Sequence, residues 1–179
     1  MTAQPTESTA TGTIRVELFL RNHGSAAVVD PLRRVVARAR RLEDEIGATV
    51  RVETWASVRP AIEELSDSGT STSLTVDAFR SWAEREGYTL RPSFERHETP
   101  SMLGQCAVEI RVPNVCVAVY EDGDLQCVAP CADRENEKRT YTVERCLDAL
   151  EAGVTEPFVD DDPQSTDDED AVERRGDTE

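Results

Sequence analysis

The stretch VCVAVYEDGDLQCVA, residues 115–129, decides the fold of this chain. Its first six residues, Val115–Tyr120, are nearly all apolar, which is typical of a strand inside a sheet that is covered on both faces. Asp122 and Gly123 follow, and this pair favours the positive φ angles of a tight hairpin turn. The run LQCVA returns after the turn, so we expect an antiparallel hairpin whose first strand is central.

Further strands are predicted on both sides of this hairpin from alternating apolar and polar residues. The run CAVEIRV, residues 106–112, alternates in the same way. Pro113 and Asn114 follow it and interrupt the strand pattern before Val115. A strand containing Pro92 is expected to be an edge or bulged strand, because proline cannot donate to the ladder. The predicted strands are Thr13–Arg21, Ala48–Trp55, Tyr88–Arg96 and those within Cys106–Ala129.

Four segments carry apolar residues at helical spacing. They are separated by turn-forming stretches, of which Asn22–Ser25 and Ser66–Ser73 are the clearest. The predicted helices are Leu32–Ile46, with Asp30 and Pro31 as N-cap and first residue and Gly47 as stop; Arg59–Leu65; Val76–Glu86, capped by Thr75; and Val143–Glu151, capped by Thr142.

This order of elements predicts an α+β fold. A strand, a helix and a strand open the chain, and several strands and a last helix close it, so we expect a two-layer domain. Its helices would cover one face of a mostly antiparallel sheet. We expect residues 13–153 to form this single domain, between a disordered N-terminal segment, 1–12, and a disordered acidic tail, 154–179.

The charge of the chain predicts where it works. The formal net charge is −16, and Lys138 is the only lysine among the basic residues. We interpret this composition as adaptation to a salt-rich cytoplasm, in preference to mimicry of nucleic acid. No signal peptide and no apolar run long enough for a membrane span is evident, so we expect a soluble, cytoplasmic protein without membrane contact.

The five cysteines do not form a pattern typical of a disulfide framework or a zinc site. Cys127 and Cys131 are four apart, but no second short-spaced pair exists. We therefore expect packed, reduced thiols, no metal and no cofactor. Cys131 is a candidate nucleophile or redox sensor, but neither His23 nor His97 is linked to it by a readable pattern. No catalytic residue and no enzyme is therefore predicted.

The candidate nucleic-acid-binding surface is the basic face of the first long helix. Five arginines lie there without an intervening acid, and a basic surface without acids attracts phosphates. Against this, acids follow at once in Glu43 and Asp44. The candidate residues are Arg33, Arg34, Arg38, Arg40 and Arg41.

A helix-turn-helix is not predicted by the pattern of elements. The motif needs two short helices joined by a turn of three or four residues. The first long helix is followed by a strand instead, and about ten residues separate Arg59–Leu65 from Val76–Glu86. Acids on the later helix would also repel phosphate.

The stretches RVELFLR, AFRSWAEREG, VCVAVYEDGDLQCVAPC and YTVERCLDALEAG resemble a family of small acidic proteins from haloarchaea. Some members of that family carry a helix-turn-helix label. The resemblance covers most of residues 15–153 and implies a role in transcriptional regulation, while no catalytic residue is implied by it.

Two functions follow as hypotheses. The first is a non-enzymatic regulatory or interaction domain of a halophile that binds DNA or a partner protein. The alternative is a small-molecule sensor with an aromatic-lined pocket formed by Trp55, Phe79 and Trp82, although core packing is the simpler role for these three side chains. The oligomeric state is left open.

Overall fold

The structure, a computed structural model, describes residues 12–22, 26–65, 71–100 and 106–159. The N-terminal segment up to residue 11, most of the two predicted turns at 23–25 and 66–70, and the tail from residue 160 lie outside the described residues. The elements are β1 (Ile14–Arg21), α1 (Ala26–Glu45), β2 (Thr49–Trp55), α2 (Pro60–Glu63), α3 (Thr72–Glu86), β3 (Tyr88–Thr89), β4 (Arg96–Pro100), β5 (Cys106–Ile110), β6 (Val115–Glu121), β7 (Asp124–Ala129), β8 (Cys131–Asp133), β9 (Thr140–Tyr141) and α4 (Val143–Glu151).

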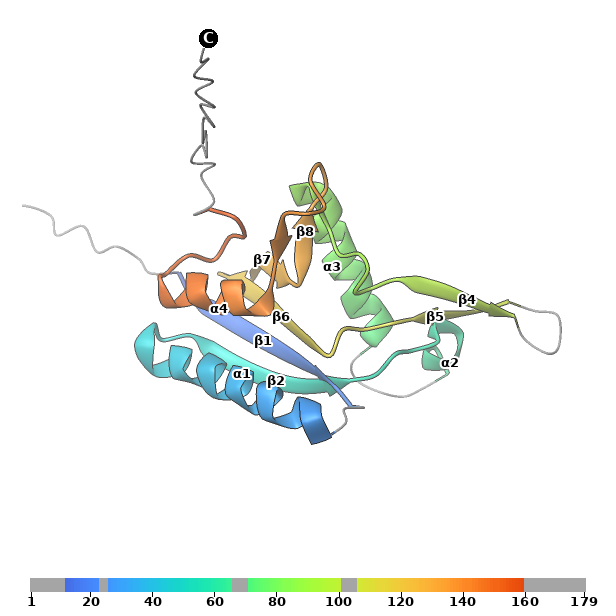
Figure 1. Cartoon of the computed structure of the whole chain (residues 1–179), viewed down its shortest axis with the longest axis horizontal. Helices are drawn as coiled ribbons and strands as arrows, with labels where there is room; N and C mark the ends of the chain where they lie inside the picture. Colours follow the sequence, from blue (N-terminus) through green and yellow to red (C-terminus); the bar gives the residue numbers. More distant parts are fainter. Residues whose placement is uncertain (1–11, 23–25, 66–70, 101–105, 160–179) are drawn as a thin grey trace, which may run out of the picture.

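The main sheet has four strands in the order β2-β1-β6-β7 (Figure 1). β1 and β2 are parallel and are connected in the chain by α1. The pairs β1–β6 and β6–β7 are antiparallel. The α+β class, the strand–helix–strand opening and the mostly antiparallel sheet are thus confirmed. β6 is central, as its apolar run predicts, and Cys116–Val119 are fully buried.

The hairpin between β6 and β7 has the predicted turn. Asp122 has a φ of 52° and Gly123 a φ of 95°, which are the positive angles that this two-residue turn requires. The Asp122 carboxylate also accepts a hydrogen bond of 2.9 Å from the backbone N–H of Thr13. The turn is therefore tied to the start of β1, which is the neighbouring strand.

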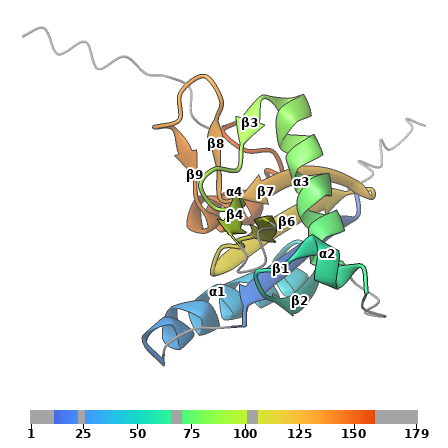
Figure 2. The same cartoon turned by 90° about the vertical axis from the view of Figure 1, so that its right-hand side faces the viewer.

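The helices lie on both faces of the main sheet (Figure 2). α4 packs on the face of Leu18 and Val119, where the Sγ atoms of Cys127 and Cys146 are 3.9 Å apart. Phe19 points to the other face, because side chains alternate along a strand. There it meets Phe79 of α3, with ring centroids 5.8 Å apart. The expected helical layer on one face, α1 with α4, is therefore accompanied by α3 on the opposite face.

Two helices begin earlier than predicted. α1 begins at Ala26, so Pro31 lies inside it and Asp30 is not its N-cap. α3 begins at Thr72, and its N-cap is Ser71, whose hydroxyl accepts a hydrogen bond from the Leu74 N–H. Thr75 is therefore helical and not a cap. By contrast, α4 begins after Thr142 as predicted, and the Thr142 hydroxyl caps the Arg145 N–H.

The predicted strand Tyr88–Arg96 was wrong. The chain forms the short β3, then a turn, and then β4. Leu90 and Phe94 are both buried and hold this turn against the core, so the segment cannot stay extended. β4 pairs with β5 in a separate two-stranded sheet, so β5 does not join the main hairpin.

Candidate nucleic-acid interface

The structure gives the five arginines of α1 different surroundings. Arg38 joins α1 to α4, because its Nε lies 2.6 Å from a carboxylate oxygen of Glu151 and its Nη2 contacts both Glu151 and Asp148. These hydrogen bonds raise the pKa of the Arg38 guanidinium above its ordinary value and lower the pKa of the Glu151 carboxyl. Arg38 therefore serves mainly to hold two helices together.

The other four arginines of α1 differ in how exposed and how paired they are. Arg33 lies 3.6 Å from Asp30, and Arg40 binds both Glu43 and the backbone carbonyl of Val50. Arg34 and Arg41 are exposed, and within the described ranges neither is within ion-pair distance of an acid. Among the described residues, Arg34 and Arg41 are thus the two arginines of this face without an ion pair, although the charge of Arg41 contributes to lowering the pKa of Glu151.

We expect Arg38→Met to lower the free energy of unfolding by about 1 kcal/mol, because charge-assisted hydrogen bonds to two acids are lost and the side chain is only partly screened by solvent. The folded-state pKa of Glu151 is depressed, so the contribution of the pair is present above the ordinary carboxyl pKa and is lost as the pH falls through the folded value. Urea unfolding at neutral and acidic pH measures both effects. Arg34→Met, on the same helix, is the control and should change stability by less than about 0.5 kcal/mol.

The three aromatic candidates lie in the core. Trp55 stacks on Phe19 with ring centroids 4.8 Å apart, and Trp82 packs on Tyr88 at 5.3 Å. Phe79 is fully buried between other rings. Neither of the two hollows described below is lined by any of these three side chains, so the aromatic-lined pocket stays a prediction.

The thiols are packed as expected, with four of the five cysteines buried and Cys106 exposed. Burial raises the pKa of Cys131 to about 12, so this thiol is protonated and poorly nucleophilic at neutral pH. No group of three or more potential metal ligands is gathered in the part of the chain that the structure describes.

A groove of about 810 Å³ opens beside α3 and collects positive charge. It is formed by α3, by β3 with the turn that follows it, by the start of β4, and by the loop between β8 and β9. Four arginines line it against three glutamates, in a chain with 36 acids and 20 bases. The charged and titratable side chains of its lining are Arg80, Arg91, Arg96, Arg134, His97, Glu84, Glu95 and Glu137.

The groove is held open by hydrogen bonds between its segments. The Arg80 guanidinium donates to the backbone carbonyl of Phe94 and so fixes α3 against the turn. Arg96 binds Asp77 of α3 at 2.8 Å. The backbone N–H of Arg134 donates to the carbonyl of Gly87 at 3.1 Å, and Gly87 ends α3 with a φ of 82°. This left-handed residue turns the chain back into β3 and brings Arg134 to the groove.

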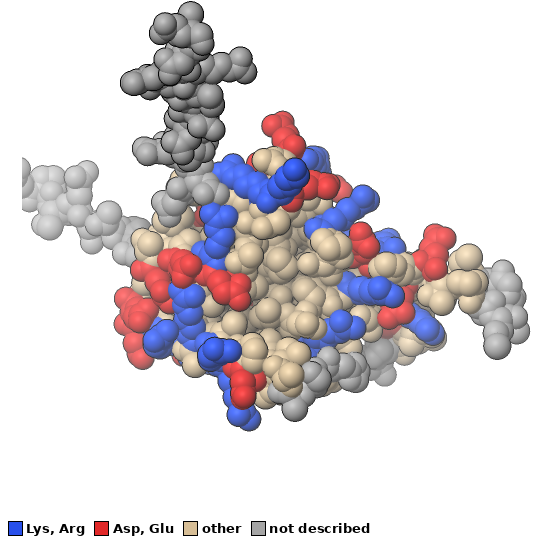
Figure 3. Space-filling model, viewed as in Figure 1, with Lys and Arg blue, Asp and Glu red and all other residues tan. Residues whose placement is uncertain are grey.

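Electrostatics in the groove favour an anion. Burial lowers the pKa of Arg80, and the positive charges of Arg96 and Arg91 lower it further, against the opposing effect of the acids Asp77 and Glu84. Arg91 and Arg134 are exposed, and no ion pair is found for either within the described residues. A bound phosphate would relieve the repulsion among these cations. In Figure 3, which has the view of Figure 1, basic side chains lie among single acidic ones over the upper and right-hand parts of the molecule.

Sequence reasoning missed this groove. Arg91 and Arg134 are far apart in the chain and come together only because β3 pairs with β8, with Tyr88 opposite Asp133. β3 has only two residues, which is too short to give a periodic signal. The sequence carries no other sign of the cluster.

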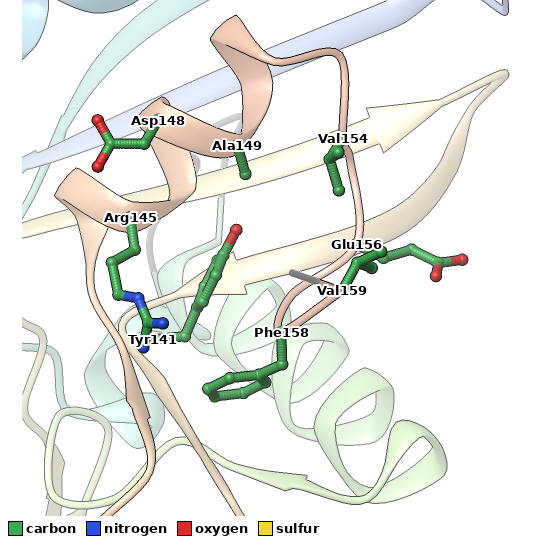
Figure 4. A pocket seen from close by; sticks show the side chains of 8 residues that line it. All are labelled: Tyr141, Arg145, Asp148, Ala149, Val154, Glu156, Phe158 and Val159. Atoms are coloured by element: carbon green, nitrogen blue, oxygen red, sulfur yellow. The ribbon is translucent and has the colours of Figure 1, made fainter. Parts of the chain in front are cut away.

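A second, smaller hollow of about 170 Å³ lies between α4 and the chain that follows it (Figure 4). Tyr141, Arg145 and Phe158 line it, while Glu156 points away from it. The packed chain therefore continues to residue 159, beyond the expected domain end at 153. Burial raises the pKa of Tyr141 far above its ordinary value.

The fold and this surface define an α+β domain with an arginine-rich groove. Residues 8–155 match the model of a family described as a helix-turn-helix domain, and the chain belongs to this family. The match supports the helix-turn-helix label that the resemblance implied. No curated protein and no solved structure matches the chain.

The described helices are not arranged as two helices with a short turn. α1 is followed by β2, and α2 is a single turn that eight residues separate from α3. The outer face of α3 also presents Asp77, Glu84 and Glu86, which are exposed. α3 is therefore a poor candidate for insertion into a DNA groove. None of the described helices is long and apolar enough to cross a membrane.

Proposed function

We propose that this protein is a non-enzymatic, transcription-related regulator that binds the phosphate backbone of DNA through the arginine groove. The proposal rests on one observation: four arginines from four separate segments line one groove of an acidic chain. Membership of the helix-turn-helix domain family supports a DNA-directed role.

The mode of binding follows from the side chains at the groove. The guanidinium group of an arginine can donate two parallel hydrogen bonds to two oxygens of one phosphate. Such contacts position a protein on DNA without reading its sequence. The acids on α3 oppose base contacts by that helix. We therefore expect affinity that depends on salt and varies little with sequence.

The arginine face of α1 is the competing surface for the same ligand. Three of its five arginines, Arg33, Arg38 and Arg40, are already paired with acids of the domain. In the groove, Arg80 and Arg96 share the single acid Asp77, while Arg91 and Arg134 are exposed and have no ion pair within the described residues. The groove is favoured because its four arginines line one hollow.

The test is DNA binding by two matched double variants. Arg91→Ala with Arg134→Ala should weaken binding about tenfold at about 0.1 M KCl and lower the salt slope by about 2, since two phosphate contacts are lost. Arg34→Ala with Arg41→Ala removes the same charge from α1 and should weaken binding far less. Fluorescence anisotropy with a labelled duplex, over a KCl series, measures both values.

Each other result has a definite meaning. If only the α1 variant loses binding, the interface lies on α1 and the groove assignment is wrong. If the wild-type chain binds no duplex at about 0.1 M KCl, where phosphate contacts are strong, the DNA proposal is overturned. We retain the proposal that the protein works in a salt-rich cytoplasm, so the series should extend to molar KCl.

A further inference from the structure

The chain is pinned beside the arginine groove just before residue 160. The ring of Phe158 lies 5.7 Å from that of Tyr88 and 5.2 Å from that of Tyr141. The Arg139 guanidinium carbon stacks over the same ring at 4.7 Å. Phe158 has a φ of 63°, a conformation that bulky residues rarely adopt, and these contacts hold it there.

These contacts hold the end of the described chain, at Phe158, against Tyr88. Tyr88, which contacts Phe158, also lines the arginine groove. Val159, the last described residue, is 55% exposed. Tyr88 therefore links the last described residues to the lining of the groove.

The segment 160–179 is complementary to the groove in charge. It contains ten acids and two arginines, in the sequence DDDPQSTDDEDAVERRGDTE. Twenty residues can extend about 65 Å, which is far more than the width of the groove. A segment tethered to the same domain as its site has an effective concentration in the millimolar range, so weak contacts suffice for substantial occupancy.

We propose that the acidic segment 160–179 binds the arginine groove of its own chain and competes there with nucleic acid. The competition rests on the proposed function, whereas the contact between segment and groove stands without it. The carboxylates of the two acidic runs, 160–162 and 167–170, occupy the positions that DNA phosphates take. The segment thereby acts as an internal competitor that admits DNA only when the DNA binds more strongly.

The chain itself offers a probe for this contact that does not involve DNA. Its only lysine, Lys138, is exposed on the β8–β9 loop, next to Glu137 of the groove lining. A carbodiimide joins a lysine amine to a carboxylate only when the two are in contact. We expect mass spectrometry of the treated full-length chain to find Lys138 linked to acids of 160–179, and this link to fall at least several-fold in the Arg91→Ala, Arg134→Ala variant.

The consequence for DNA is tested in the full-length chain with the run 167–170 neutralised. Asp167→Asn, Asp168→Asn, Glu169→Gln and Asp170→Asn should raise the affinity for a duplex about fivefold at about 0.1 M KCl. The matched control removes four exposed acids that do not line the groove, by Asp44→Asn, Glu45→Gln, Glu53→Gln and Asp124→Asn, and should raise it much less.

The outcomes separate the two proposals. A Lys138 link without any DNA binding supports the segment–groove contact and overturns the proposed function. DNA binding without the link, and with equal effects of both neutralised variants, overturns the internal competitor and leaves the proposed function standing. A link that persists unchanged when the groove arginines are removed also overturns the assignment of the segment to the groove.

Discussion

Phe79→Ala is expected to lower the free energy of unfolding by about 3–5 kcal/mol, a large share of the stability of a domain of this size. Phe79 is fully buried and its ring contacts those of Phe19 and Phe94, at centroid distances of 5.8 and 6.2 Å. Truncation leaves a cavity between α3 and the main sheet, and the edge-to-face contacts of both rings are lost.

Denaturant unfolding followed by circular dichroism measures this change. Ile62→Ala is the control, because Ile62 is 63% exposed and its truncation should cost less than about 0.5 kcal/mol. A Phe79→Ala chain as stable as the wild type would mean that α3 does not pack on the sheet as described.

Glu63→Ala is expected to lower the free energy of unfolding by about 1–3 kcal/mol, because the Glu63 carboxylate caps α3 from the preceding helix. It accepts hydrogen bonds from the backbone N–H groups of Thr72 and Ser73 and from the hydroxyls of Ser71 and Ser73. Without it, the first N–H groups of α3 lose their partner. Glu64→Ala, an exposed neighbour, is the control.

The same cap makes stability depend on pH. Burial works to raise the pKa of Glu63, but the hydrogen bonds from Ser73, Ser71 and Thr72 outweigh it, so the pKa lies below its ordinary value. The contribution of the cap is therefore complete above the ordinary value of about 4.3 and is lost as the pH falls through the folded value. Wild type should lose more stability than Glu63→Gln between about pH 6 and pH 3; equal losses would show that Glu63 is not the cap.

The parts of the fold that were predictable depend on local signals. The unbroken apolar run of β6 indicates a strand covered on both faces, and Asp122 with Gly123 indicates the turn that follows. Thr142 lies directly before its helix and caps it. In each case the residues that determine the structure are neighbours in the chain.

The parts that were missed depend on contacts between distant residues. Ser71 and Glu63 together cap the N-terminus of α3. No local sequence pattern favours Ser71 over Thr75 as the N-cap residue. The groove is even harder to predict from the sequence, because Arg134 and Arg91 are brought to it by the two-residue pairing of β3 with β8. The arginines of α1 form the clearest basic pattern in the sequence, yet Arg38 binds acids of α4 that are more than a hundred residues away.

We expect the separate β4–β5 sheet to open at a lower free energy than the main sheet. It extends away from the main body in Figure 1, shares no strand with the four-stranded sheet, and is joined to the segment before α2 by the bridge Val58–Ile110. Its amide hydrogens should therefore exchange through local opening, well before those of β6. Because β4 begins at Arg96, which lines the groove, slower exchange of its first amides than of the rest of β4 would show that the Arg96–Asp77 ion pair holds this end of the small sheet to α3.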